Sequence, residues 1–590
     1  MTMPSRPLAS SLANVLIASL TRLVILAALI PFALAACGSG EDTAAPAGQS
    51  QAPADQASQA TQANQASQAT QANQASQKAP KEVVVAIYRD GKFDELDAAS
   101  YNGPHFIFKM IYEGFVEDGG KGEIIPVLAT SWDISEDGRT YVYHLREGVK
   151  FTDGTDFNAE AVVFNLKRWI NDGYFDGLSS VNVESVEAVD PLTVKVVYAD
   201  GAYPILVEQS YPRPVRFLSP ASIKPDPSNP RGIFEKPVGT GPWMLETYVK
   251  DQEFTLVPNP GYWGPKPKID RLRFKVVTDS QARILALRSG EVAIVGGDLM
   301  GKIPLGLVPE IMGEPTLEVK LKGTLCAHFI AFNNTTGKFD DKNLRMAINH
   351  ALDKKAVAEG LFDNIGLVAN GFFQRDTPYT TESNNYAYPG DKELAKKLLD
   401  DGGYLDTDGD GVREKDGQKL EYKLVLTVDE FPEWKPLAEY VQAELASVGI
   451  KINLTILDRN SYTDMTYYMT GQSPRDYDLA LKRTSSDSQV PHGELLTGFL
   501  PWPNPEDPAR IWTDPHLSEM VKQTLNTLDS AERQKRFDEL LGFISSEAIT
   551  VPIYHPVTAF AIDPTKIKDF EIGVNNYAPV EWSKLDVADK

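Results

Sequence analysis

The composition of the chain changes abruptly near residue 80, and this change limits which part of the protein can fold. Residues 38–80 are mostly Ala, Gln, Ser, Thr and Asn, and the nine-residue unit 56–64 recurs almost unchanged. A stretch with so few large apolar side chains cannot offset the conformational entropy that folding removes. We therefore expect residues 37–80 to form a disordered tether and the folded part to begin at Lys81.

The segment before the tether has the pattern of an export signal. Arg6 and Arg22 precede an almost uninterrupted apolar run over 23–36, as in signal peptides. The run is shorter than the roughly 20 residues that span a bilayer. It ends in Leu-Ala-Ala before Cys37, which resembles the lipobox of bacterial lipoproteins. The resemblance implies removal of 1–36, a diacylglycerol on the Cys37 thiol, and an extracytoplasmic protein anchored to the cell membrane by lipid.

Length and charge restrict the folded part further. With 590 residues the chain is too long for one core, so several domains are expected. Its 58 Lys and Arg against 81 Asp and Glu give a net charge of −23, which is the wrong sign for binding nucleic acid. The two cysteines, Cys37 and Cys326, lie in very different surroundings, and no disulfide between them is expected.

Strand and helix patterns alternate after residue 80. Apolar runs at 82–87, 192–197 and 422–427 predict strands. Asn158 is a suitable N-cap for a helix, and two further helices are predicted after Asp341 and over 437–448. Their spacing places apolar side chains on one face: Val162, Leu166, Trp169 and Ile170; Leu344, Ile348 and Ala351; Leu437, Tyr440, Val441, Leu445 and Val448. The pattern indicates mixed α/β structure in more than one lobe.

Five runs of sequence, 136–154, 237–243, 259–264, 345–349 and 551–554, resemble one family. This is the family of extracytoplasmic solute-binding proteins, of the peptide and nickel class, that serve ATP-binding-cassette (ABC) importers. Gly239 and Gly241 of the second run indicate a place where backbone passes close to backbone. We interpret these runs as scaffold rather than as ligand contacts.

The resemblance implies an α/β, periplasmic-binding-protein-like clamshell of two lobes with an additional third domain. We expect lobe I to comprise 81–124, 240–335 and 555–590, its subdomain 125–239, and lobe II 336–554. In such proteins the ligand binds between the lobes, which close around it, and the permease recognises the closed form. The expected partners are the permease subunits of an ABC importer, and we expect a monomer.

Within this family the chain resembles the nickel-binding branch. The runs 203–206 and 211–217 are similar to an Arg-Pro-aromatic-Arg-Phe run of nickel receptors whose first arginine faces the cleft. On that resemblance Arg213 would hold a carboxylate of an organic nickel chelate in a bidentate fork. Nickel, as an organic chelate, would be the transported ligand, and no catalytic cofactor is expected.

The seven histidines supply candidate nickel ligands, because nickel prefers imidazole and carboxylate donors. By resemblance His105 and His555 lie at cleft positions, and this pair is the predicted metal contact. The chain lacks the histidine that one type of nickel receptor carries shortly after an Arg-Thr-Trp segment, since here Ser485 follows Arg483-Thr484. His492 is a further candidate ligand contact, with a loop-stabilising role as the alternative.

Weaker candidates have structural explanations. Cys326 and His328 share a strand face, as a soft metal pair or as a packed thiol and imidazole. His144, His350 and His516 lie in scaffold-like stretches. The run 406–411, Asp-Thr-Asp-Gly-Asp-Gly, resembles the first half of a calcium loop, but its twelfth position is Gly417 rather than glutamate. A polar hairpin turn is therefore the favoured interpretation.

The main alternative is a di- or oligopeptide receptor on the same scaffold. Such receptors offer an acidic group to the peptide amine, and Asp487 is one candidate. An enzyme is not expected, because the sequence contains no G-x-S-x-G, H-E-x-x-H or phosphate-loop motif.

Overall fold

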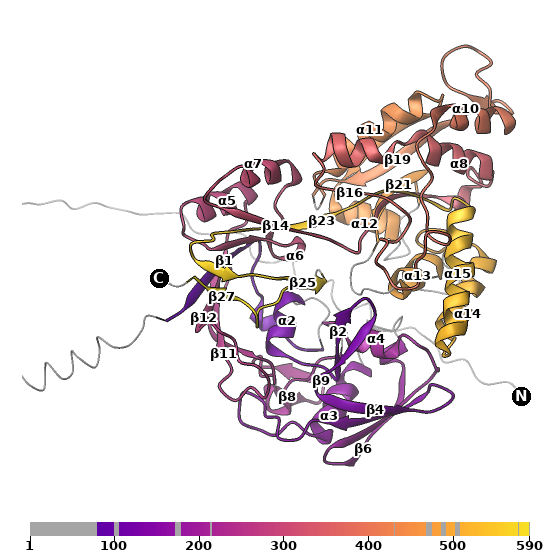
Figure 1. The fold of residues 1–590 in the computed structure, drawn as a ribbon. Helices are drawn as coiled ribbons and strands as arrows, with labels where there is room; N and C mark the ends of the chain where they lie inside the picture. The colour runs from indigo at the N-terminus through magenta and orange to yellow at the C-terminus, as the bar shows by residue number, and fades with distance from the viewer. Residues whose placement is uncertain are drawn as a thin grey trace, which may run out of the picture. The chain divides into compact units, whose positions relative to one another are not determined.

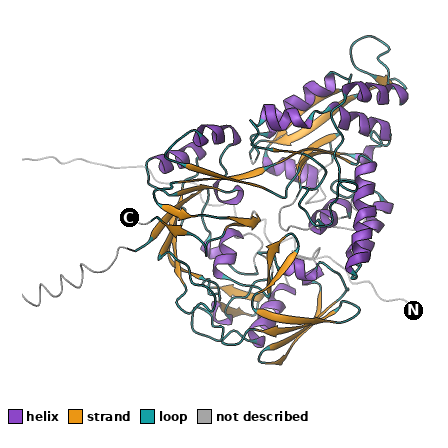
Figure 2. Ribbon diagram, viewed as in Figure 1, coloured by secondary structure: helices purple, strands orange, loops and turns teal. Residues whose placement is uncertain are grey.

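The computed structural model describes residues 80–99, 105–170, 179–212, 215–429, 431–467, 475–484, 491–501, 508–575 and 577–588. The predicted signal, Cys37, the tether and Arg213 lie outside these residues. The described chain from Pro80 onward forms one compact unit of mixed α/β structure (Figure 2). No helix among the described residues is long and apolar enough to span a membrane.

A seven-stranded sheet is built from both ends of the described chain (Figure 1). Its strand order is β10 (Trp243–Val249), β11 (Glu253–Pro258), β12 (Arg271–Val276), β1 (Glu82–Ile87), β13 (Ile294–Gly296), β23 (Val557–Ile562) and β14 (Glu318–Gly323). The predicted strand at 82–87 is confirmed as β1, which pairs in parallel with β12 and β13. Val83, Val85 and Ile87 are buried, so this sheet has a hydrophobic core.

A separate four-stranded antiparallel sheet lies within the segment predicted as the subdomain. It contains β4 (Ala129–Ile134), β5 (Thr140–Leu145), β7 (Thr193–Tyr198) and β6 (Val183–Asp190). Helix α3 (Ala159–Ile170) starts where predicted, because the Asn158 side chain accepts a hydrogen bond from the Ala161 amide at 3.0 Å. Its predicted face is buried except for Ile170, which is 39% exposed at the last helical position.

A six-stranded sheet forms the second α/β region, in the order β16 (Leu367–Val368), β22 (Thr550–His555), β15 (His328–Phe332), β21 (Leu479–Arg483), β19 (Glu421–Thr427) and β20 (Lys451–Leu457). The predicted helices are α8 (Lys342–Ala351) and α11 (Trp434–Ala446). Their apolar faces pack into one core with the sheet, and only Tyr440 of the predicted face residues is partly exposed.

The chain crosses between the two larger sheets twice, and the two crossings lie side by side. Residues 324–327 lead from β14 to β15, and Pro556 joins β22 to β23. The Thr324 amide and hydroxyl both donate to the Pro556 carbonyl, at 2.9 and 3.0 Å. The lobe boundaries expected from the sequence stay a prediction. Residues 328–332, which were expected in lobe I, are hydrogen-bonded within the six-stranded sheet of the second region.

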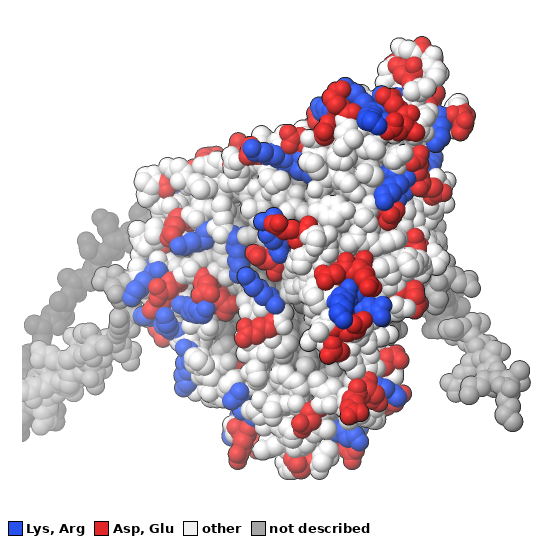
Figure 3. Space-filling view, turned by 45° about the vertical axis from the view of Figure 1, so that its right-hand side comes forward, with Lys and Arg blue, Asp and Glu red and all other residues white. Residues whose placement is uncertain are grey.

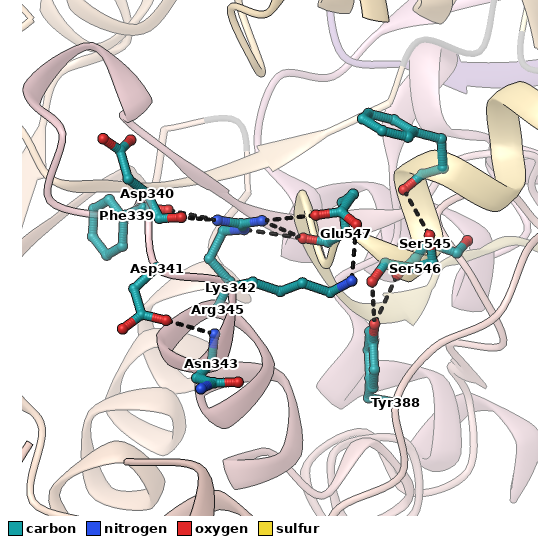
Figure 4. Close-up of polar contacts among 11 residues, drawn as sticks. Phe339, Asp340, Asp341, Lys342, Asn343, Arg345, Tyr388, Ser545, Ser546 and Glu547 are labelled. Carbon is teal, nitrogen blue, oxygen red and sulfur yellow. Dashed lines mark hydrogen bonds and ion pairs between the residues drawn. The ribbon is translucent and has the colours of Figure 1, made fainter. Parts of the chain in front are cut away.

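Contacts of the run 345–349 hold the second α/β region together. In the run 345–349, the Arg345 guanidinium donates to the carbonyls of Phe339 and Asp340 and twice to the Glu547 carbonyl, at 2.8 to 3.0 Å (Figure 4). This joins the start of α8 to the end of α15 (Ser530–Ser546). Asn349 also donates to the Thr550 carbonyl at 3.1 Å. The scaffold interpretation accounts for these contacts.

A second scaffold element, the Glu113 network, consists of Glu113, Thr240, Tyr262 and Trp263. The buried carboxylate accepts hydrogen bonds from Thr240 Oγ1 at 2.8 Å, Trp263 Nε1 at 2.9 Å and Tyr262 OH at 3.0 Å. Burial raises the pKa of Glu113 to about 7, although these hydrogen bonds oppose the rise.

The close backbone approach expected at Gly239 and Gly241 is confirmed. A Cβ atom would lie 2.0 Å from the Ile111 carbonyl oxygen at Gly239 and 2.6 Å from that of Met110 at Gly241. Only glycine fits at these two positions, which bring Thr240 against Glu113.

Candidate functional site

The strands that meet at the crossings bring polar and aromatic side chains together. We call this group the crossing cluster: Lys302, Asn370, Cys326, His328, Phe431, Glu433, Trp434, Arg483, Tyr554 and His555. At its centre, His328 Nδ1 accepts a hydrogen bond from Trp434 Nε1 at 2.7 Å, and its ring lies 4.6 Å from that of Tyr554. Burial, together with the positive charges of Lys302 and Arg483, lowers the pKa of His328, so its imidazole is neutral at neutral pH.

Two cations of the cluster lie near the same aromatic ring. The Lys302 ammonium is 5.6 Å and the Arg483 guanidinium 5.4 Å from the centre of the Phe431 ring. Lys302 follows α6 (Asp298–Gly301), beside the seven-stranded sheet, whereas Arg483 ends β21 of the other sheet. Such an arrangement of cations over a ring face suits the binding of an anionic group.

The carboxylates of Glu433 and Asp298 offset this charge. Lys302 donates to Glu433 at 2.5 Å, and Glu433 is the N-cap residue of α11. The pair therefore joins the two α/β regions. Although burial opposes it, the Glu433 carboxylate raises the pKa of Lys302. The Asp298 carboxylate also acts on Lys302, so two cations and two carboxylates lie close together here.

His555, one half of the predicted metal pair, belongs to this cluster. Its Nδ1 lies 3.1 Å from the Cys326 carbonyl oxygen and its Nε2 lies 3.0 Å from Asn370 Oδ1. Burial lowers the pKa of His555 to about 4. The ring is thus neutral, as metal binding requires, but it can bind a metal only by giving up one of these two contacts.

His105, the other half of the pair, is the first residue of α2 (His105–Ile111) and is partly exposed. Its ring meets the edge of Tyr577 at 4.8 Å between centroids. Tyr577 belongs to the hairpin of β25 (Ile572–Asn575) and β26 (Ala578–Val580). This hairpin and the first crossing line a small recess, bounded by residues 322–325, Thr558, 572–575 and Pro579.

His492 is fully buried at the start of α13 (His492–Phe499). Its Nε2 lies 2.9 Å from the Tyr211 hydroxyl and 3.7 Å from Glu208 Oε1, whereas its Nδ1 has no hydrogen-bond partner among the described residues. Burial lowers the pKa of His492 to about 3 and raises that of Glu208 to about 7. These contacts join α13 to the segment after α4 (Ile205–Gln209), and a ligand role for His492 stays a prediction.

The remaining histidines have ordinary partners. His144 lies 3.0 Å from Asp133, and His350 Nδ1 lies 2.8 Å from the Pro389 carbonyl oxygen. His516 packs against Phe543 at 5.4 Å. Cys326 is buried, with its sulfur 3.9 Å from Arg483 Nη1. Arg213, Ser485 and Asp487 lie outside the described residues.

Sequence reasoning did not anticipate the role of Lys302, Glu433 and Asn370 in this cluster. Lys302 and Glu433 are 131 residues apart, and neither lies in a motif that marks it. For Arg483 the sequence offers one weak indication of a binding role: it directly precedes the stretch in which, by the resemblance, one type of nickel receptor carries its metal-binding histidine.

Comparisons with known proteins agree with this architecture. The model of "Bacterial extracellular solute-binding proteins, family 5 Middle" matches residues 123–504. The nickel-binding periplasmic protein of Escherichia coli K12 is 28% identical over 482 residues, covering 80% of this chain and 88% of that protein. The glutathione-binding protein GsiB of the same strain is 26% identical over 486 residues, covering 80% and 89%. The crystal structure of Brucella suis NikA in complex with Fe(III)-EDTA is 27% identical, with a TM-score of 0.77, covering 86% of this chain and all of that one.

Proposed function

This chain belongs to the bacterial extracellular solute-binding proteins of family 5, and on that basis we propose that its solute is nickel held as an organic chelate. Members of the family are extracytoplasmic substrate-binding proteins of ABC importers that work with permease subunits, and the family is one of transport proteins rather than enzymes. The proposal concerns the ligand, the residues that bind it, and the anchor that holds the protein at the membrane.

The observation that carries the proposal is the crossing cluster, which brings two cations and two imidazoles together between the two α/β regions. Nickel reaches a receptor of this kind as a complex with carboxylate-bearing organic molecules, so the site must bind an anionic group and a metal together. Arg483 and Lys302 supply charge for a carboxylate. Arg213, proposed to grip a carboxylate bidentately, would add a third cation.

Imidazoles are proposed as the direct metal ligands. His555 lies within the cluster and His105 lies near the hairpin that lines the adjoining recess. For His555 to bind nickel through Nε2, Asn370 must release it, while the contact with the Cys326 carbonyl would fix the tautomer of the ring. The similarity to the nickel-binding protein of Escherichia coli supports this choice of metal.

The proposal extends to the membrane. A lipid on Cys37, followed by the tether, would hold a monomeric receptor near its permease and leave it free to reach the permease and its ligand. Labelling cells with a radioactive fatty acid tests this part: the wild-type chain should carry the label and Cys37→Ser should not. Label on the Cys37→Ser chain would contradict the assignment of the anchor.

A peptide is the second candidate ligand, because the glutathione-binding relative is similar over nearly the same share of the chain. A peptide carboxylate would use the same cations. The difference lies in the imidazoles, which a peptide without metal does not need.

Calorimetric titration separates the two candidates. Nickel with excess L-histidine should bind the full chain, and replacing both His105 and His555 by Ala should abolish that binding while the far-ultraviolet circular dichroism spectrum stays unchanged. His144→Ala is the matched control, since it removes an exposed imidazole elsewhere. Unaltered nickel affinity in the double variant, or glutathione and peptide binding with no response to nickel, would refute the nickel proposal.

A further inference from the structure

A loop outside the crossing cluster carries three carboxylates that converge. It follows α10 (Lys392–Asp401), labelled in Figure 1, and precedes the short hairpin of β17 (Glu414–Lys415) and β18 (Gln418–Lys419). One carboxylate oxygen from each of Asp406, Asp408 and Glu414 lies within 4.8 Å of one from the other two. Among the described residues this is the one group of His, Cys, Asp or Glu side chains with such spacing.

Convergent acidic side chains on a surface are not by themselves a binding site, and the decisive observation concerns Glu414. Its side chain is only 9% exposed, unlike those of Asp406 and Asp408, which are exposed. Glu414 Oε1 accepts hydrogen bonds from the Thr407 amide, at 2.9 Å, and from the Thr407 hydroxyl. Its other oxygen, Oε2, is buried and has no hydrogen-bond partner among the described residues. A buried, unpartnered carboxylate oxygen is costly unless a cation binds it.

We propose that the loop 406–414 is a calcium site in which Asp406, Asp408 and Glu414 are ligands. Calcium binds six to eight oxygens in flexible geometry, so these carboxylates would supply part of the shell, and loop carbonyls and water the rest. The expectation of a plain hairpin rested on Gly417 at the twelfth position of the loop. Glu414, at the ninth, supplies the acid that the twelfth position lacks.

A lysine of the adjoining hairpin pairs with the loop's exposed carboxylates. Lys419 donates to Asp408 at 2.7 Å and also to Asp410. Its single positive charge is shared between two of the loop's carboxylates, and Glu414 Oε2 is left without a hydrogen-bond partner among the described residues. Calcium and Lys419 therefore compete for Asp408, and removing the lysine charge should strengthen calcium binding.

The inference goes beyond the proposed function, because it involves no residue of the crossing cluster. Calorimetric titration of CaCl₂ into the full chain, freed of metal with a chelator, tests it. We expect one calcium per chain with a dissociation constant between about 10⁻⁵ and 10⁻³ M, and weaker binding of magnesium, which demands a stricter geometry. No heat with calcium, or equal binding of magnesium, would overturn the proposal.

Variants assign the binding to the loop. Glu414→Gln should weaken calcium binding roughly tenfold or more, because a neutral amide replaces a carboxylate, and Lys419→Gln should strengthen it several-fold. Asp416→Asn is the matched control: it removes one negative charge from the same hairpin and should change the affinity by no more than about twofold.

Circular dichroism in chelator checks that each variant is folded. If Glu414→Gln does not fold, Asp408→Asn, at an exposed position, takes its place. Wild-type calcium affinity in the folded variant would overturn the proposal. The double variant of His105 and His555 should bind calcium as the wild type does, so failure of the nickel proposal and failure of this one are distinguishable.

Discussion

The crossing cluster and the Glu113 network are both buried groups of polar and aromatic residues, yet they differ in how their charges are met. Around Glu113, three neutral donors surround one carboxyl group, and its pKa of about 7 shows that burial outweighs the hydrogen bonds. In the crossing cluster, two cations lie near an aromatic ring and close to two carboxylates, those of Glu433 and Asp298.

This difference in how charges are met distinguishes a group that stabilises the fold from one that can bind a ligand. A carboxyl group with its hydrogen bonds filled by its own chain has little left to offer a ligand, and its value is the fixed geometry of the backbone around it. Cations that lie between two α/β regions can instead form charge-assisted hydrogen bonds with an anionic ligand that binds there. Surface charge does not make this distinction, since acidic and basic side chains are interspersed over the face in Figure 3.

The largest expected effect is on stability at the Glu113 network. Glu113→Ala removes the acceptor of one buried and two partly buried donors and leaves a cavity, so it should lower the free energy of unfolding by about 3–5 kcal/mol. Denaturant titration measures the loss. The folded fraction should still bind ligand normally; a loss below about 1 kcal/mol would mean that the network is not a structural element.

Glu113 should also make stability depend on pH. Its pKa rises from 4.5 to about 7 in the fold, so folding favours the protonated form. The penalty is absent below about pH 4.5, grows as pH rises, and is complete above about pH 7, where it amounts to about 3 kcal/mol. Glu113→Gln should remove the part of the decline in melting temperature with rising pH that Glu113 causes. The part caused by Glu208, whose pKa is also about 7, should remain in this variant. An unchanged pH profile would contradict the burial argument.

Substitution of a cation within the crossing cluster should weaken ligand binding and leave stability nearly unchanged. Arg483→Met keeps much of the apolar packing but removes a charge, and should weaken the binding of nickel with L-histidine by roughly 10- to 100-fold, the range of a charged hydrogen bond. Stability should change little. Arg536→Met, which removes an exposed arginine from α15, is the control. Equal affinity of the two variants for nickel with L-histidine would mean that the crossing cluster does not bind the ligand.

The smallest effect is expected at Glu433. Glu433→Gln removes the negative charge that offsets Lys302, so the cluster becomes more positive and should bind an anionic ligand more tightly, by roughly two- to fivefold. Added salt should reduce the gain. Weaker binding would indicate that Glu433 itself contacts the ligand, as a peptide amine would require.

Local features of the fold were predictable and long-range ones were not. The strand at 82–87, the Asn158 cap and the glycines at 239 and 241 each depend on neighbours in sequence, and they were found. The adjacency of the crossings joins Thr324 to Pro556, 232 residues away, and no local pattern encodes it. Ile170 was expected to be buried because periodicity does not reveal where a helix ends.

The candidate site shows the same division. Histidines could be selected by residue type and by resemblance, but that His555 already contacts Cys326 and Asn370 depends on strand register and on a loop from elsewhere. In the acidic loop, comparison with the twelve-position calcium loop did not single out Glu414, because it stands at the ninth position. Its carboxylate comes close to those of Asp406 and Asp408 only because the hairpin folds back.

The most direct test of the account is small-angle X-ray scattering of the full chain with and without a saturating ligand, offered as nickel with L-histidine or as glutathione. If the two α/β regions close on a solute at the crossings, the radius of gyration should fall on saturation in the wild type and stay constant in Arg483→Met at the same ligand concentration. Calorimetric saturation of the wild type with no change in scattering would contradict capture by closure.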